Sequence, residues 1–238
     1  MATKKNTVKT VKKVPRPRPA NAAASSPVEP TPAQRRHPWY IALLVAGLVL
    51  LGGSAALAVL GSPSGLEQHI FRVVNHVQAP AWVTSQLAKP LSNAVYGMVG
   101  LVVLLLLWPK FRLRSWQYVV AGGSAYVLGE IIARLVDRAR PMGLDGFDAV
   151  MRANQGGPGF PSGHVATLTA LGLTAWPYLG WPWRLLIVTL IVAEGWSRVF
   201  LGEHAPLDVV GGLGVGMVTV AVIHLTPAKI RKFFRINA

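Results

Sequence analysis

Long apolar segments constrain this chain more than any other feature of its sequence. An α-helix needs about 20 mostly apolar residues to cross a bilayer, and six segments come close to that length. Of all residues, 52% are hydrophobic and 14% are charged, whereas a soluble domain has about 25% charged residues. The sequence therefore predicts an all-α, polytopic membrane protein with six transmembrane helices, at residues 39–60, 91–108, 116–136, 163–180, 185–202 and 206–226.

Two segments refine this prediction. Residues 66–77 (LEQHIFRVVNHV) are amphipathic, so we expect a short helix along the membrane surface between the first and second spans. Small residues let transmembrane helices approach closely, and the sixth span is therefore predicted to pack tightly in the interior. Its glycines are Gly211, Gly212, Gly214 and Gly216.

The chain divides into three regions by composition. Residues 1–38 hold nine Lys and Arg residues, one acidic residue and a proline-rich run. Such a segment has nothing to bury in a core and is predicted to be a disordered, basic cytoplasmic tail. Contact with anionic lipid headgroups, worth about 1 kcal/mol for each basic residue, is a further possibility for it. Residues 39–226 would form the membrane domain, and residues 227–238 a second basic cytoplasmic tail.

The distribution of charge predicts an orientation. With a cytoplasmic N-terminus, 17 of the 24 Lys and Arg residues lie on the cytoplasmic side of a cell membrane, as the positive-inside rule requires. Both termini are then cytoplasmic. The formal charge of +15 lies mainly in the tails and one short loop, without an aromatic or fold signature of nucleic-acid binding, so no nucleic-acid partner is expected. The absence of cysteine excludes disulfides, thiolate metal sites and cysteine nucleophiles.

In this topology the unusual polar residues gather at the extracytoplasmic ends of the helices. Ionisable groups at membrane depth are costly, so such a cluster indicates a functional site. The residues come from the end of the third span, the start of the fourth, and the turn between the fifth and sixth: Arg134, Arg140, Ser162, His164, Arg198, His204 and Asp208.

The residue types suit phosphoryl transfer. Arginines supply planar, multidentate donors for phosphate oxygens, and a Pro-Ser-Gly-His turn that opens a helix presents free backbone N–H groups to an anion. Ser162 stands at the N-cap, and Gly163 allows a close approach of the backbone. His204 and Asp208 are four residues apart, so they share a face if that turn is helical, and the carboxylate can then orient the imidazole as a nucleophile. His164 can then protonate the leaving oxygen.

Each of these residues has a simpler alternative reading. A single interfacial histidine is more often packed or solvated than catalytic, and arginines near a membrane surface often contact headgroups. The two histidines with Asp208 could hold a metal, but they lack an obvious further ligand, so no metal or cofactor is expected.

The motifs resemble those of the type 2 phosphatidic acid phosphatase superfamily of integral-membrane lipid phosphatases. Its Pro-Ser-Gly-His motif stands intact at 161–164, and its Ser-Arg, five residues, His, three residues, Asp motif stands intact at 197–208. The resemblance covers roughly residues 60–226. It implies that His204 is the nucleophile, that Asp208 orients it and that His164 is the general acid. It also implies a phosphate site without metal, formed by Arg140, Ser162, Gly163 and Arg198.

The first motif of that family, a Lys seven residues before Arg-Pro, departs from the pattern. Arg140-Pro141 is present, but Ala133 stands at the Lys position and Arg134 follows it. One residue turns a helix by about 100°, yet Arg is long, so Arg134 is expected to bind phosphate, with Arg138 as a second candidate. The alternatives are a site with fewer cations, or pairing of Arg134 with Asp137 or Glu130.

Three further carboxylates lie near the cluster. We expect Glu130 and Glu194 to pair with the site arginines, since charges within spans usually pair. Selection of a substrate headgroup is the alternative for both. Glu203 precedes His204 and is expected to be exposed at the mouth of the site.

Together these features predict an enzyme: a metal-independent lipid phosphate phosphatase that acts through a phosphohistidine at the extracytoplasmic face. The substrate class implied by the resemblance is a polyprenyl (di)phosphate of envelope biosynthesis, as in bacterial members, or a glycerolipid phosphate. The alternative is a catalytically silent relative that binds or moves phospholipids. Binding alone would not need an oriented nucleophile together with an acid, so the intact His164, His204 and Asp208 favour the enzyme.

Overall fold

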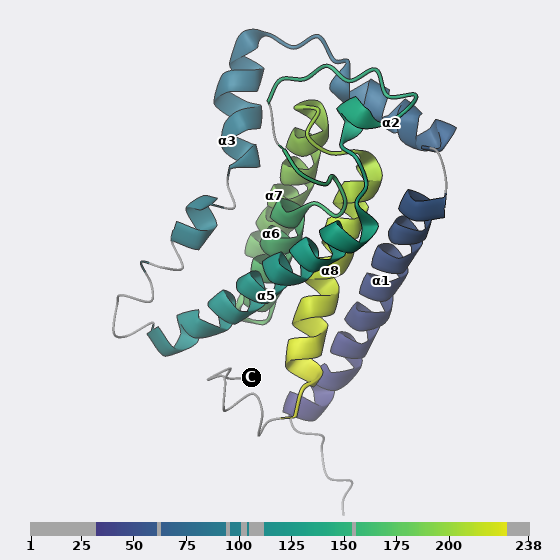
Figure 1. Cartoon of the computed structure of the whole chain (residues 1–238). Helices are drawn as coiled ribbons and strands as arrows, with labels where there is room; N and C mark the ends of the chain where they lie inside the picture. Colours follow the sequence, from purple (N-terminus) through teal and green to yellow (C-terminus); the bar gives the residue numbers. More distant parts are fainter. Residues whose placement is uncertain are drawn as a thin grey trace, which may run out of the picture.

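The computed structural model describes residues 32–60, 63–93, 96–100, 104, 112–153 and 156–227, and within these ranges every regular element is helical. The predicted all-α class is confirmed. Short 3₁₀ turns follow α5 and α6, at Pro141–Gly143 and Trp176–Tyr178. The helices are α1 (Pro32–Leu60), α2 (Gly65–Asn75), a π-helical turn (Val83–Ala88) that continues into α3 (Lys89–Ser92), α5 (Arg112–Val136), α6 (Gly163–Ala175), α7 (Trp181–Phe200) and α8 (Pro206–Leu225) (Figure 1).

Within the described part of the chain, three helices are long and apolar enough to cross a membrane: Pro38–Leu60, Trp116–Gly143 and Pro206–Leu225. They coincide with the first, third and sixth predicted spans. The fourth and fifth predicted spans correspond to α6 and α7, and α6 ends at Ala175, before the 3₁₀ turn. The second predicted span is described as helical at 96–100, and most of its remainder lies outside the described residues.

The two predicted tails lie mostly outside the described residues, which begin at 32 and end at 227. Helix α1 begins at Pro32 rather than at Trp39, so its first residues belong to the segment predicted as a tail. Helix α2 falls where the amphipathic segment was expected.

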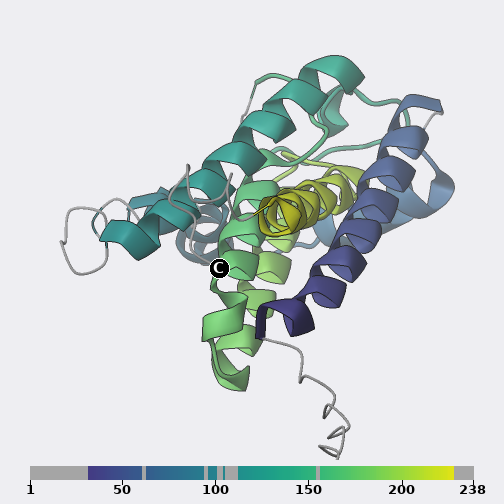
Figure 2. The same cartoon turned by 90° about the horizontal axis from the view of Figure 1, so that it is seen from below.

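Helix α8 is central to the bundle. Seen from below, it lies between α1, α5 and α6 (Figure 2). The predicted close packing of its glycines is confirmed. A Cβ at Gly212 would lie 2.5 Å from the backbone oxygen of Ser162, the N-cap of α6, and one at Gly214 would lie 2.6 Å from the backbone nitrogen of Leu51 in α1. The backbone of α8 therefore rests directly on its two neighbours.

Gly212→Ala is expected to lower the unfolding temperature, because the added methyl group would force α6 away from α8. Overpacking of this kind costs about 1–3 kcal/mol. Gly53→Ala is the matched control, since a Cβ there meets no atom within 4 Å. Thermal unfolding in detergent measures both variants, and equal melting temperatures would show that α6 and α8 do not pack this closely.

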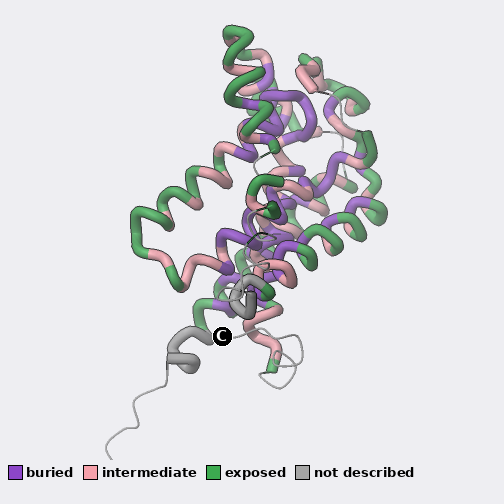
Figure 3. The backbone as a smooth tube through the Cα atoms, turned by 90° about the vertical axis from the view of Figure 1, so that its left-hand side faces the viewer, coloured by how far each residue is buried: buried purple, intermediate pink, exposed green. Residues whose placement is uncertain are grey.

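The outer faces of the bundle are apolar and exposed. Figure 3 shows buried backbone through the interior and exposed residues along the outer helix faces, where α1 presents Val49, Leu57 and Leu60. Large exposed apolar faces of this kind suit contact with lipid.

At one end of the bundle Tyr40 of α1 stacks on His224 of α8 with ring centroids 4.3 Å apart, so the two described ends of the chain lie together. At the opposite end α7 finishes and α8 begins (Figure 1).

Candidate active site

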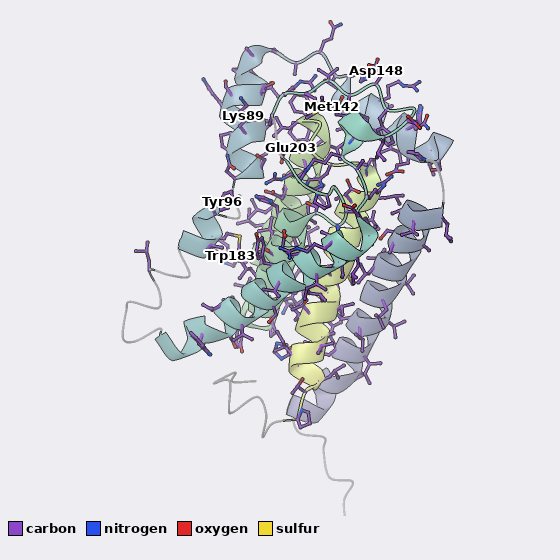
Figure 4. All side chains as sticks on the ribbon, in the orientation of Figure 1. Lys89, Tyr96, Met142, Asp148, Trp183 and Glu203 are labelled. Atoms are coloured by element: carbon purple, nitrogen blue, oxygen red, sulfur yellow. The ribbon has the colours of Figure 1, made fainter. Side chains whose placement is uncertain are left out.

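Apart from Arg134, the predicted site residues come together at the end of the bundle away from the described chain ends. The segment after α5, the N-terminus of α6, the turn between α7 and α8, and the first turn of α8 meet there. Figure 4 shows Met142, Asp148 and Glu203 at this same end.

His204 lies in the turn between α7 and α8 and is buried, with 3% of its surface exposed. Its Nδ1 lies 2.8 Å from the carbonyl oxygen of Gly159 and 3.6 Å from Oδ2 of Asp208. A carbonyl only accepts hydrogen bonds, so Nδ1 carries the proton and Nε2 presents its lone pair. Burial lowers the pKa of His204, although Asp208 opposes this effect. The neutral, nucleophilic form of the ring is therefore favoured.

Gly159 is a site residue that sequence reasoning missed. A Cβ at this position would lie 2.9 Å from the backbone oxygen of Ala139 and 3.2 Å from Oδ2 of Asp208. Only glycine fits there, and its carbonyl is closer to the imidazole than the carboxylate predicted to orient it. The glycine before the Pro-Ser-Gly-His turn was the available signal.

Asp208 is fully buried and links three parts of the site. Its Oδ2 accepts a hydrogen bond from the backbone N–H of Ala205 at 2.7 Å, and its Oδ1 accepts one from Nη1 of Arg138 at 2.8 Å. Its backbone oxygen accepts the N–H of Ser162 at 2.8 Å, which joins the first turn of α8 to the N-terminus of α6. The carboxylate is thus held rigidly beside His204.

Arg140 is half-buried and lies next to Nε2, the unprotonated nitrogen of His204. It donates to the backbone oxygens of Gly157 at 3.1 Å and Glu203 at 2.6 Å, and its Nη1 is 3.4 Å from Nε2 of His204. A guanidinium in this position can contact an oxygen of any phosphorus that the imidazole attacks.

Arg198 is fully buried near the end of α7. Its Nε donates to Glu194 at 3.0 Å, its Nη1 donates to Glu203 at 2.5 Å, and its Nη2 donates to the backbone oxygen of Ser92. A guanidinium has five N–H groups, so two of them take no part in these three bonds.

The N-terminus of α6 carries polar atoms without partners. Within the described part of the chain, Oγ of Ser162 and Nε2 of His164 are buried and have no hydrogen-bond partner. His164 is close enough to His204, Arg140 and Arg198 to interact with them electrostatically. Buried polar atoms normally have a hydrogen-bond partner. Two such atoms without a partner, at a helix N-terminus and near arginines, are suited to binding an anion.

An apolar cavity of about 310 Å³ adjoins this polar cluster. The ring of Tyr96 meets that of His164 edge-on, with centroids 5.2 Å apart. The cavity is lined by Tyr96, Val99, Tyr118, Val119, Gly122, Gly123, Tyr126, Gly163, His164, Thr167 and Leu171.

Comparison with known proteins identifies the family. The model of the PAP2 superfamily matches residues 114–232, which is half of the chain. The chain belongs to the PAP2 superfamily. The resemblance that the motifs carried is thereby confirmed.

The chain is also similar to two named phosphatases and to a solved PAP2 structure. An undecaprenyl-diphosphatase of Sulfolobus acidocaldarius is 26% identical over 186 residues, which cover 76% of this chain and 87% of that protein. A decaprenylphosphoryl-5-phosphoribose phosphatase of Mycobacterium tuberculosis is 33% identical over 146 residues, which cover 57% of this chain and 76% of that protein. A PAP2-type phosphatidylglycerolphosphate phosphatase from Bacillus subtilis shares the fold, with a TM-score of 0.60 and 19% identity over 76% of this chain and 92% of that one. This PAP2 chain is therefore a membrane hydrolase of phosphate esters.

Two predictions about carboxylates in the PAP2 chain need correction. Glu203 is not exposed: 3% of its surface is accessible, because it pairs with the buried Arg198. Glu194 pairs with Arg198 as predicted. Glu130 is exposed, and in the described part of the chain it forms no ion pair.

The cations after α5 are arranged differently from the favoured prediction. Arg134 is exposed and makes no hydrogen bond or ion pair among the described residues, so its role in phosphate binding stays a prediction. Arg138, the second candidate, is the one that enters the site, where it binds Asp208 and Glu67.

Proposed function

We propose that this PAP2 protein removes phosphate from a polyprenyl (di)phosphate or glycerolipid phosphate, through a phosphohistidine on His204. One observation carries the proposal: the unprotonated Nε2 of His204 lies 3.4 Å from Arg140, next to polar atoms at the N-terminus of α6 that have no partner among the described residues, and this site adjoins an apolar cavity. A phosphate head and a hydrocarbon tail each have a matching environment.

The phosphate would dock at the N-terminus of α6. Ser162, Gly163 and the first N–H groups of α6 would bind its oxygens, and Arg140 with the remaining N–H groups of Arg198 would neutralise its charge. This arrangement needs no cofactor, because all of the charge stabilisation comes from side chains and backbone.

The reaction has two steps. Nε2 of His204 attacks phosphorus, the N–P bond forms, and the bond from phosphorus to the leaving oxygen breaks as His164 gives that oxygen a proton. A water molecule then attacks the phosphohistidine and gives its proton to His164, which releases phosphate and restores His204. The carbonyl of Gly159 and the carboxylate of Asp208 hold the Nδ1 proton throughout.

Two observations favour a lipid with a long tail. The cavity walls are aromatic and aliphatic, and Gly123 lines the cavity with open space where a side chain would stand. The names of the Sulfolobus and Mycobacterium relatives both refer to a polyprenyl substrate. A polyprenyl substrate is therefore the first choice, and a glycerolipid phosphate the second.

The proposed topology has six spans, cytoplasmic termini and an extracytoplasmic site. Two observations support it: the described chain ends lie together, away from the site, and the basic residues fall mainly on the side of the termini. In this orientation the substrate would enter from the outer leaflet of the cell membrane.

Gly123→Leu should block the tail without touching the phosphate site. We expect KM for a long-chain lipid phosphate to rise about tenfold, since lost burial of a few methylene groups costs about 0.8 kcal/mol each, while turnover of water-soluble p-nitrophenyl phosphate stays unchanged. Gly53→Leu on α1, which also points into open space, is the control. An unchanged KM for the lipid would place the tail elsewhere.

The proposal is tested directly with the protein purified in detergent and assayed in EDTA. The substrates are undecaprenyl diphosphate, a polyprenyl monophosphate, phosphatidic acid and phosphatidylglycerophosphate. Phosphate release without metal is expected, fastest from a polyprenyl substrate. A folded protein that releases phosphate from none of the four would contradict the proposed function and favour the silent, lipid-binding alternative.

A further inference from the structure

Helix α2 turns one charged residue inward. Its buried residues, Glu67, Phe71 and Asn75, recur every four positions and so form one stripe. At the far end of the stripe, Asn75 donates to backbone oxygens of Val199 and Phe200 and so anchors α2 to the end of α7. At the near end Glu67 is 4% exposed. A carboxylate is rarely buried unless it is paired.

Glu67 is not used as its local sequence would suggest. Ser64 and Glu67 have the spacing of a capping box, in which the glutamate binds the backbone N–H of the N-cap residue. The serine side does accept the N–H of Glu67, at 3.1 Å. The carboxylate instead accepts Nη2 of Arg138 at 3.0 and 2.9 Å, together with the N–H of Leu207 at 3.2 Å.

Arg138 reaches the nucleophile by two routes. Its Nη1 holds Oδ1 of Asp208, whose other oxygen faces His204. Its backbone oxygen accepts the N–H of Gly159 at 2.7 Å, and the carbonyl of Gly159 is the group that contacts Nδ1 of His204. Both groups that orient the imidazole are thus fixed by Arg138.

The cluster of Glu67, Arg138 and Asp208 holds two negative charges and one positive charge. One buried guanidinium lies between two carboxylates, and both of its terminal nitrogens are bound to them. Arg138 is therefore poorly placed to bind phosphate. The second carboxylate shares the charge of Arg138, so Asp208 keeps negative charge for the imidazole, which becomes positive as it attacks phosphorus.

We propose that Glu67 is a positioning residue of the reaction: it fixes Arg138, and Arg138 fixes Asp208 and Gly159 on His204. This inference rests on the proposed function. It makes α2, which lies outside the family motifs, a functional part of the active site. It also means that Arg138 orients the nucleophile and does not bind the phosphate.

Glu67→Gln tests the proposal, because it keeps the shape of the side chain and removes its charge. We expect kcat to fall about 10- to 100-fold, the range for loss of a hydrogen bond between charged groups. Two inhibitors separate positioning from a loss of folded protein. Vanadate gains a fifth ligand from the nucleophile and so mimics the transition state, whereas inorganic phosphate reports ground-state binding. The inhibition constant of vanadate should rise in parallel with the loss of kcat, and that of phosphate should stay constant.

Arg72→Gln is the matched control, since it removes one charge from the exposed face of the same helix and should change none of these constants. Glu67→Asp, which keeps the charge but shortens the reach, replaces Glu67→Gln if that variant does not fold. In Glu67→Gln/Arg138→Gln, kcat should be no lower than in Arg138→Gln alone, because Glu67 acts through Arg138.

Either of two results would overturn the proposal: unchanged inhibition by vanadate in Glu67→Gln, or losses in the two single variants that multiply in the double variant. Turnover of the wild type and of His204→Gln is measured alongside, with both proteins prepared in the same way. If both are as expected, failure of the Glu67 test refutes the positioning role alone and leaves the proposed function intact.

Discussion

His204→Gln is expected to abolish phosphate release, with kcat lower by about 10⁴- to 10⁶-fold, the range seen when a nucleophile or its base is removed. The reason is structural: Nε2 of His204 is the unprotonated nitrogen, because Nδ1 donates its proton to the carbonyl of Gly159. Glutamine keeps a polar side chain in the buried turn but cannot form the N–P bond. Steady-state release from the best lipid substrate measures the effect.

A control separates lost chemistry from lost structure. His69→Gln changes an exposed histidine on α2 and should leave turnover unchanged. His204→Gln should also still bind the substrate, because Arg140, Ser162 and the apolar cavity are unaltered. Turnover of His204→Gln within tenfold of the wild type, about 1.4 kcal/mol in barrier, would refute a histidine nucleophile at this position.

His164→Gln is expected to produce the second largest loss, about 10²- to 10⁴-fold, as for removal of a general acid. Nε2 of His164 has no partner among the described residues and adjoins both the arginines and the cavity, so it lies where the leaving oxygen would be. The loss should depend on the leaving group. It should be large for a lipid monophosphate, whose alkoxide needs a proton, and much smaller for p-nitrophenyl phosphate, whose phenolate leaves unaided.

Comparison of the two substrates tests this role. The wild type sets the reference ratio, and Thr167→Val, which changes the neighbouring cavity wall on α6, should keep that ratio. Equal losses on the lipid and on p-nitrophenyl phosphate in His164→Gln would mean that His164 binds phosphate instead of donating the proton.

The part of the fold that local sequence determines was predictable. Apolar length placed α1, α5 and α8, because a helix in lipid must satisfy its own backbone over the full width of the bilayer. The glycines of α8 indicated close packing, since small residues let helices approach closely. The two intact motifs predicted that His164, His204 and Asp208 would lie together, because the spacing within each motif is short. His204 itself lies in the turn before α8 and not on a helix.

Contacts between distant segments were not predictable from local patterns. Glu203 looked exposed because it stands beside a polar turn, but Gly202 adopts a positive φ of 79°, and the carboxylate meets Arg198. The link from Glu67 to Arg138 joins residues far apart in the chain. Gly159 acts through its backbone oxygen, which side-chain chemistry does not reveal.

Detection of the covalent intermediate tests the central claim most directly. The protein is mixed with radiolabelled lipid phosphate, quenched at alkaline pH after a fraction of one turnover, digested and analysed by mass spectrometry. A labelled phosphoryl group on His204, stable to alkali and lost in acid, is the expected result, and His164→Gln should still form it from a substrate with a good leaving group. Label on another residue, or none in an enzyme that turns over, would contradict the phosphohistidine mechanism.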